Sequence, residues 1–363
     1  MAKLSPDTTI TLANGVEMPI LGFSIEDIAK KSYNIRTQSD LILEAIDAGF
    51  RYFDTAEDHG GLRALGAAVK KSGIPREEFF ISSKMRLDEM SDGRFYQAID
   101  ETLLELDMDY LDLYSIHWPG YITIDWPKRI AFIDAFCGRE ISKTENGDAD
   151  GLIQFYQTGL TRAIGVCNFE IHHMEELLKT DKCTVKPMIN QCHFHPLHAS
   201  LKLREYCKEN DIVFGGLFEE NELIQPTKPR MATDVNRAGL LYQTSEEHVQ
   251  ANYAVRLAPE RRSSELKESP YDYSKNPRRE KGFFDDCDGV TEIAQKYGKT
   301  NNQVVTRWSM QSGVVTTVKA FLPEQIKSEY IVFDFALSDE DMETMNRFNM
   351  GMRFGYHPDY IDF

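Results

Sequence analysis

The sequence predicts an α/β protein whose eight parallel strands and helices form a (β/α)8 (TIM) barrel, with an N-terminal β-hairpin and long loops on the C-terminal face. Short β-branched or aromatic runs alternate along the chain with amphipathic stretches of helical length. Such alternation implies parallel strands, because a parallel pair needs a crossover connection. An open doubly wound sheet is the alternative, and the absence of G-x-G-x-x-G after the first strand weakens it.

The strands and helices can be assigned in order along the chain. Strand-like runs occupy residues 18–23, 51–56, 79–85, 110–117, 163–168, 188–194, 212–218 and 314–320. Helical patterns occupy residues 37–48, 61–72, 94–106, 151–158, 199–209, 301–311 and 339–348. Gly49 ends the first of these helices. Thr300 and Gln303 have the spacing of a capping box, and Ser338 and Asp341 nearly do, so two helix starts are marked near the C-terminus.

Two long segments interrupt this alternation, at residues 119–149 and 219–282. Both follow a strand, so in a barrel both lie over the C-terminal face, where active sites are built. The second contains a helical pattern at 245–257, and its residues 256–281 carry eight basic and five acidic side chains. This local charge of +3 indicates either a solvated loop or a lid that attracts an anionic ligand. A barrel needs about 250 residues, so the 363 residues are predicted to form one domain, 1–363, with two long loops.

Composition limits the classes of function. Hydrophobic residues make up 42% and charged residues 27% of the chain, as in soluble globular proteins. The net charge of −17 disfavours binding to nucleic acid. Six cysteines without a C-x-x-C pair indicate reduced thiols in a cytoplasmic protein. No apolar run is long enough for a signal peptide or a membrane span, so a small-molecule substrate is expected rather than a membrane or nucleic-acid partner.

Ionisable residues stand at the ends of three successive predicted strands. Asp54 ends the second strand, Lys84 the third and His117 the fourth. An ionisable group in an apolar run is costly unless it is paired, and an Asp facing a Lys offsets that cost. Each residue taken alone would more often be structural. Three at neighbouring strand ends favour a catalytic cluster.

Seven stretches match, in order, the signatures of a known family: GFRYFDTAEDHGGLRALGAAV, FFISSKM, LDLYSIHWP, GLTRAIGVCNF, KPMINQCHFHP, AQKYGKTNNQVVTRWSMQSGVV and FALSDEDMETMNRF. On these motifs the chain resembles the aldo-keto reductases, over nearly its whole length except the two long segments. The resemblance implies a (β/α)8 barrel, reduction of carbonyls or the reverse oxidation with NADPH or NADH, and a monomer or weak homo-oligomer.

The family uses a tetrad of Asp, Tyr, Lys and His, and this chain departs from it at one position. Asp54, Lys84 and His117 match three members, whereas His59 stands where the family has Tyr. An imidazole has a pKa of about 6.5 and a phenol one of about 10. Beside Lys84 the imidazole would be held neutral, which makes it a serviceable base and a weak acid. We therefore expect His59 and His117 to act as acid and base, and the alternative is that His59 is a passive relic in a decayed site.

The resemblance also assigns cofactor-binding positions. They are Ser24, Asp54, Cys167, Asn168, Gln191, Leu217, Phe218, Lys319 and Gln325. Several depart from the family: Leu217 or Phe218 takes the place of the aromatic that stacks on the nicotinamide, and Gln325 replaces an arginine of the phosphate clamp. Glu329 replaces an asparagine, which leaves Lys319 as the remaining cation. Loss of Arg–phosphate contacts predicts weakened or lost cofactor binding, unless basic residues of the long loop, such as Arg256, supply another clamp.

The sequence gives weaker signals for metal binding and for nucleophilic catalysis. Cys192, His193 and His195 could contribute to a zinc site, but the C-x2-C spacing is missing, so no metal site is predicted. Cys167 at a strand end is either a nucleophile beside a His or a small buried filler. Three hypotheses remain: an oxidoreductase that uses His59, a barrel enzyme that performs proton transfer without a redox step, and a non-catalytic binding protein.

Overall fold

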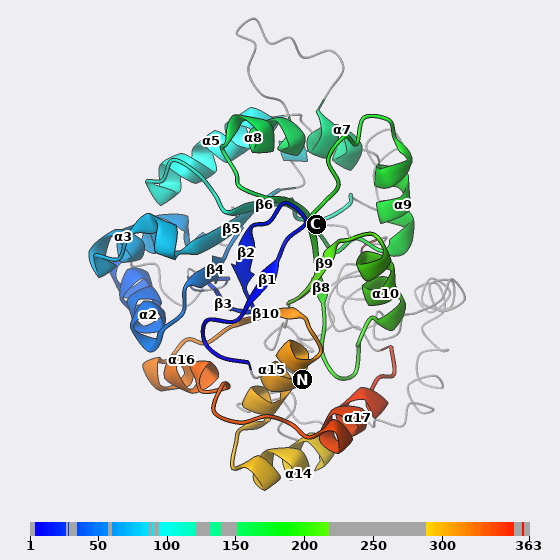
Figure 1. The fold of residues 1–363 in the computed structure, drawn as a ribbon. Coiled ribbons are helices and arrows are strands. Elements are labelled where there is room, and N and C mark those ends of the chain that lie inside the picture. The colour runs from blue at the N-terminus through cyan, green and yellow to red at the C-terminus, as the bar shows by residue number, and fades with distance from the viewer. Residues whose placement is uncertain are drawn as a thin grey trace, which may run out of the picture.

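A computed structural model gives the structure of the protein for residues 4–26, 28, 35–56, 60–86, 89–90, 94–120, 131–138, 151–217, 288–351 and 358. Eight strands close into a barrel in the order β10, β3, β4, β5, β6, β7, β8 and β9, and every neighbouring pair is parallel (Figure 1). The strands are β3 (Leu21–Ser24), β4 (Tyr52–Asp54), β5 (Phe80–Met85), β6 (Leu113–Ile116), β7 (Ile164–Cys167), β8 (Ile189–His193), β9 (Val213–Leu217) and β10 (Val315–Val318). The predicted (β/α)8 barrel is confirmed, and each predicted run overlaps one of these strands.

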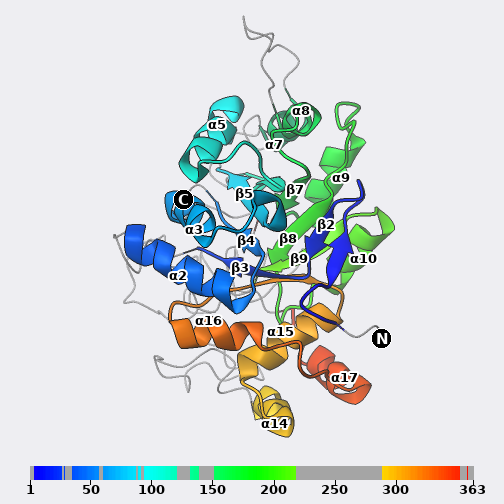
Figure 2. The ribbon, with the colours of Figure 1, turned by 60° about the vertical axis from the view of Figure 1, so that its left-hand side comes forward.

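Helices surround the barrel on its outside (Figures 1 and 2). They are α2 (Ile35–Ala48), α3 (Leu62–Ser72), α5 (Phe95–Leu106), α7 (Ala131–Cys137), α8 (Leu152–Thr158), α9 (Ile171–Lys179), α10 (Leu201–Glu209), α14 (Asp288–Tyr297), α15 (Asn301–Gln311), α16 (Pro323–Tyr330) and α17 (Asp339–Arg347). The sequence did not predict α7, α9, α14 or α16. The apolar pattern of α16 is weak, because its buried residues are only Ile326 and Glu329.

The N-terminal hairpin covers the end of the barrel opposite the predicted site. Strands β1 (Thr9–Thr11) and β2 (Glu17–Pro19) pair antiparallel and lie across the barrel in Figure 1. The Asn14 amide donates a hydrogen bond of 2.9 Å to the carbonyl of Arg162, which precedes β7. The hairpin therefore covers the N-terminal ends of the strands, and the C-terminal ends stay available for a site.

The structure shows how one predicted helix begins and how closely two strands of the barrel pack. Thr300 Oγ1 accepts from the Gln303 amide at 3.2 Å and Gln303 Oε1 accepts from the Thr300 amide at 3.0 Å, which confirms the capping box of α15. Inside the barrel, the Tyr52 ring packs directly on the backbone of Gly22. A Cβ at that position would lie 2.1 Å from the ring, so only glycine fits there.

The two long segments lie largely outside the described residues. Helix α7 falls within 119–149, where the sequence led us to expect an irregular loop. The segment 219–282, with its helical pattern and basic stretch, lies wholly outside them. Among the helices that the structure describes, none has the length and apolar character needed to cross a membrane.

Candidate active site

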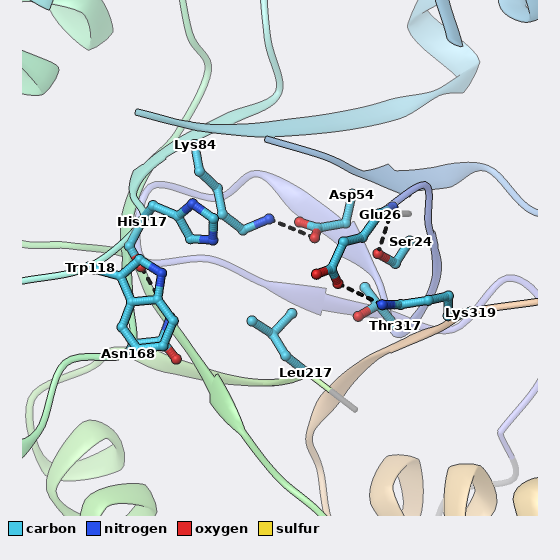
Figure 3. Close-up of a pocket in the computed structure, with 10 residues that line it drawn as sticks. All are labelled: Ser24, Glu26, Asp54, Lys84, His117, Trp118, Asn168, Leu217, Thr317 and Lys319. Atoms are coloured by element: carbon cyan, nitrogen blue, oxygen red, sulfur yellow. Dashed lines mark hydrogen bonds and ion pairs between the residues drawn. The ribbon is translucent and has the colours of Figure 1, made fainter. Parts of the chain in front are cut away.

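A small cavity, partly open to solvent, lies where the C-terminal ends of the barrel strands meet (Figure 3). Its lining residues are Ser24, Glu26, Asp54, Lys84, His117, Trp118, Asn168, Leu217, Thr317 and Lys319. Seven of these ten are residues that the sequence singled out for catalysis or cofactor binding. The barrel brings them together because each stands at or just after the end of a strand.

A buried ion pair forms one side of this cavity. Lys84 Nζ lies 2.6 Å from Asp54 Oδ2, and the two side chains are 1% and 2% exposed. The ammonium also donates to the Thr55 carbonyl at 2.9 Å. Two of its three N–H groups thus have acceptors among the described residues. Burial, the largest single effect, lowers the pKa of Lys84, but the charge and hydrogen bond of Asp54 together with neighbouring groups such as Glu26 outweigh it and raise that pKa, so the side chain is cationic at neutral pH.

Three further side chains hold the Asp54 carboxylate in place. Its Oδ1 atom accepts from Ser82 Oγ at 2.6 Å, from Gln191 Nε2 at 3.2 Å and from the Tyr52 hydroxyl at 3.3 Å. The sequence reasoning missed Tyr52 and Ser82. The two-residue period of the strands could have found them, since Tyr52 shares a face of β4 with Asp54 and Ser82 shares a face of β5 with Lys84. Burial and the Asp54 charge raise the pKa of Tyr52 well above its ordinary value, so this phenol remains protonated.

His117 and Asn168 lie at the next strand ends. The amide of His117 donates to the Met85 carbonyl at 3.2 Å, and its own carbonyl accepts from Asn168 Nδ2 at 3.1 Å. Asn168 has φ 61°, a left-handed conformation that asparagine tolerates better than most residues. Figure 3 shows the His117 ring beside the Lys84 side chain at the wall of the cavity. The imidazole and the ammonium therefore face the same space.

Cys167 and Gln191 lie behind this wall and do not line the cavity. The Cys167 thiol donates to Gln191 Oε1 at 3.6 Å. Burial raises the pKa of Cys167 to about 12, which keeps it a neutral thiol and disfavours the nucleophile interpretation. The Gln191 amide nitrogen is shared between Asp54 and Tyr52. Both residues therefore support the Asp54–Lys84 pair in this structure.

A second ion pair crosses the cavity. The sequence predicted one partner, Lys319, and did not predict the other, Glu26. Lys319 Nζ lies 2.8 Å from Glu26 Oε2, with side chains 3% and 21% exposed. Figure 3 shows the Glu26 carboxylate turned toward Lys319 across the opening between Asp54 and Leu217. The Glu26 amide donates to Ser24 Oγ at 3.3 Å, which fixes the start of this turn. Glu26 follows a strand end, so the rule that found Asp54 could also have found it.

The remaining predicted positions lie elsewhere. Gln325 is exposed on α16 and does not line the cavity. Glu329, on the same helix, is buried and accepts from Asn302 Nδ2 at 3.4 Å. His59 and Phe218 lie outside the described residues, so their predicted roles stay predictions. Over the part of the chain that the structure covers, no group of His, Cys, Asp or Glu has the geometry of a metal site.

Comparison with known proteins gives one family throughout. A sequence model of the Aldo/keto reductase family matches residues 21–350. Glyoxal reductase of Bacillus subtilis (strain 168) is 31% identical over 355 residues, covering 98% of each chain. The 9,11-endoperoxide prostaglandin H2 reductase of Trypanosoma cruzi (strain CL Brener) is 30% identical, covering 96% of this chain and 94% of its own. The crystal structure of MGS-M4, an aldo-keto reductase from a Medee basin deep-sea metagenome library, superposes with a TM-score of 0.68 at 25% identity, covering 98% of this chain and 100% of its own.

Proposed function

The chain belongs to the aldo/keto reductase family, and we propose that it is an oxidoreductase that interconverts a carbonyl compound and its alcohol with a nicotinamide cofactor. One observation carries the proposal: the buried Asp54–Lys84 ion pair opens with His117 onto a single cavity. A buried ion pair contributes little to stability compared with apolar residues of similar volume. Its position at the mouth of the barrel therefore supports a chemical role.

The residues of the chain itself would handle charge on the reacting oxygen. A carbonyl oxygen gains negative charge as it is reduced, and fixed hydrogen-bond donors stabilise that charge. The Lys84 ammonium, held by Asp54, is the cationic donor at this place. Asp54 already accepts four hydrogen bonds, so it positions Lys84 and does not take up the proton. We assign the proton to His59 by its place in the sequence, and His117, which lines the cavity, to the accompanying acid–base step.

The side chains that line the cavity suit a nicotinamide cofactor under one condition. The cofactor supplies a hydride when it is bound. Asn168 offers an amide for the carboxamide, and Lys319 offers the cation for a phosphate. Because Glu26 already pairs with Lys319, a phosphate reaches that cation only when the Glu26 carboxylate gives way. This supports weakened binding of NADPH or NADH.

A second candidate is proton-transfer chemistry in the same cavity without a redox step. Two observations favour it. Leu217 lines the cavity at the position where the family has its stacking aromatic residue, and Glu26 occupies the cation that a phosphate would need. The neutral imidazole expected at His59 suits proton abstraction. Cofactor binding separates the two candidates.

The substrate, the cellular location and the oligomeric state are proposals as well. The glyoxal and methylglyoxal reductases among the relatives act, by their names, on small dicarbonyl compounds. We propose a small carbonyl compound of this kind as substrate, and a single-domain cytoplasmic protein that is monomeric or weakly homo-oligomeric. Glyoxal and methylglyoxal are therefore the first substrates to assay.

Cofactor titration and turnover test the proposal together. We expect NADH or NADPH to raise the melting temperature, since a ligand that binds the folded state stabilises it, and to be oxidised in the presence of a dicarbonyl. Lys84→Met should lower kcat/KM by about a hundredfold or more, because it removes a charge that acts in the transition state. Lys70→Met is the matched control, because Lys70 forms an exposed pair with Asp107. No thermal shift at millimolar concentrations of either cofactor would contradict the oxidoreductase proposal.

A further inference from the structure

One asparagine joins two neighbouring strand ends at the wall of the cavity. Asn168 directly follows β7 and is 5% exposed. Its Nδ2 atom donates to the carbonyl of His117, which directly follows β6, at 3.1 Å (Figure 3). Both residues line the cavity. The Asn168 side chain therefore connects the end of β7 to the backbone that carries the predicted acid–base residue His117.

The backbone of Asn168 is held from the side of β8. Its amide donates to the Gln191 carbonyl at 2.9 Å. The next residue, Phe169, is clamped by the side chain of buried Asn190: Asn190 Nδ2 donates to the Phe169 carbonyl at 2.8 Å, and Asn190 Oδ1 accepts from the Phe169 amide at 3.4 Å. These bonds hold Asn168 in its left-handed conformation, with φ 61°. Its carboxamide is thus presented to His117 from a fixed turn.

The backbone of His117 is held from both neighbouring strands. Strand β6 lies between β5 and β7 in the barrel. The His117 amide donates to the Met85 carbonyl at the end of β5, at 3.2 Å, and the His117 carbonyl accepts from Asn168. That carbonyl belongs to the peptide group next to the Cα atom from which the imidazole extends. The hydrogen bond from Asn168 therefore restricts the rotation that would swing the ring within the cavity.

We propose that Asn168 is a positioning residue for His117, which it holds in the cavity through the His117 carbonyl. This role rests on the proposed function, in which His117 takes part in the acid–base step. The family resemblance assigns Asn168 to the carboxamide of the cofactor. The two roles are compatible, because a primary amide has two N–H donors and one acceptor oxygen.

The position demands two properties that asparagine combines. The left-handed backbone is tolerated by asparagine, aspartate and glycine better than by other residues. The His117 carbonyl needs a donor, which asparagine has, whereas glycine lacks one and an ionised aspartate offers only acceptors. Asn168→Gly therefore removes the hydrogen bond without straining the turn. Asn168→Asp also keeps the size of the side chain and serves as an independent second variant.

The ring signal of His117 in the free protein tests the positioning directly. The chain has nine histidines, so the protein is labelled with ¹³C-histidine and the His117 signal is identified by its loss in His117→Gln. We expect this signal to move or split in Asn168→Gly and in Asn168→Asp. Asn14→Ala is the matched control, because Asn14 Nδ2 donates to the Arg162 carbonyl at 2.9 Å at the opposite end of the barrel. The control should leave the His117 signal unchanged.

Kinetics of Asn168→Gly with methylglyoxal give the second readout. We expect kcat to fall by about tenfold or more, because a small displacement of an acid–base group is costly, and KM for methylglyoxal to change by less than about threefold. An unchanged His117 signal in both Asn168 variants would overturn the proposal. Weaker NADPH binding with kcat preserved at saturating cofactor would also overturn it, since Asn168 would then serve the carboxamide alone. A wild type that neither binds cofactor nor turns over contradicts the proposed function instead, and the signal of the free protein still tests the positioning.

Discussion

Replacing Glu26 by Gln should tighten the binding of NADPH. The two side chains have nearly the same shape, so the change removes the negative charge and little else. Lys319 is 3% exposed and lies 2.8 Å from the Glu26 carboxylate. A phosphate that uses this cation must first displace Glu26, and in the variant it meets only a neutral amide. NADPH carries more phosphate charge than NADH, so its binding should gain more.

The magnitude follows from the geometry of the pair. Two unit charges 2.8 Å apart attract by about 6 kcal/mol at an effective dielectric constant of about 20. Much of this gross attraction is offset, because both charges are desolvated when they pair. If a quarter to a half of it is returned to the ligand, NADPH affinity rises by roughly ten- to a hundredfold, since each factor of ten corresponds to about 1.4 kcal/mol.

The assay is a fluorescence titration of both cofactors, combined with a melting curve of the free protein. The free variant should melt at a lower temperature than the wild type, because Lys319 loses its counter-charge, and NADPH should raise its melting temperature more. Glu44→Gln is the control, since Glu44 pairs with Lys327 on the exposed surface at 3.1 Å. A dissociation constant for NADPH within about threefold of the wild type, under 1 kcal/mol, would refute the electrostatic reasoning.

Two packing changes and one titration give further predictions. Gly22→Ala should displace the Tyr52 ring, whose nearest atom lies 2.1 Å from the added Cβ, and lower kcat more than a surface change of the same kind. Gly66→Ala should reduce the free energy of unfolding by about 1–3 kcal/mol or more in urea titrations, because the Cβ would lie 2.1 Å from the Leu106 carbonyl oxygen. Burial opposes ionisation of Asp341, but hydrogen bonds, the largest from Lys296, lower its pKa to about 2. The stability it contributes is present above its ordinary pKa of 3.8 and is lost as pH falls toward 2, so Asp341→Asn should flatten that part of the acid-unfolding curve.

Alternation of strands and helices was enough to predict the barrel, and strand-end position was enough to predict the end of the barrel at which the cavity lies. Asp54 and Lys84 were predicted because an ionisable group inside an apolar run is costly unless it is paired. Tyr52 and Ser82 were not predicted, because a hydroxyl within a strand does not by itself indicate a site; the two-residue period and the pairing of β4 with β5 would have placed both beside Asp54. Gln191 was found for its expected contact with a cofactor, and the structure gives it hydrogen bonds to Asp54 and Tyr52.

The position of Glu26 after a strand end could be predicted from the sequence, but its pairing with Lys319 could not. Its partner Lys319 lies 293 residues away, directly after β10, the strand that closes the barrel against β3. The local sequence around Glu26 predicts an ordinary turn after a strand. The local sequence around Lys319 predicts a cation that binds a ligand. Only closure of the barrel sets the two side chains face to face. The pairing lowers the expected affinity of Lys319 for a phosphate, because a cation that already has a buried counter-charge is a weaker anion site than the sequence suggests.

The state of the Asp54 carboxylate bears on whether the cavity is still used. It accepts hydrogen bonds from Lys84, Ser82, Gln191 and Tyr52, all of them buried. Replacing a buried ion pair by well-packed apolar residues is often neutral or stabilising by about 1–4 kcal/mol. A protein that used this barrel only as a scaffold would therefore lose nothing by filling the space with leucine or valine. The persistence of four donors around one carboxylate, at the rim of a cavity, is better explained by chemistry that requires a fixed ammonium at Lys84. A fixed ammonium of this kind is expected in an enzyme rather than in a binding protein, for either reaction class that the cofactor titration will separate.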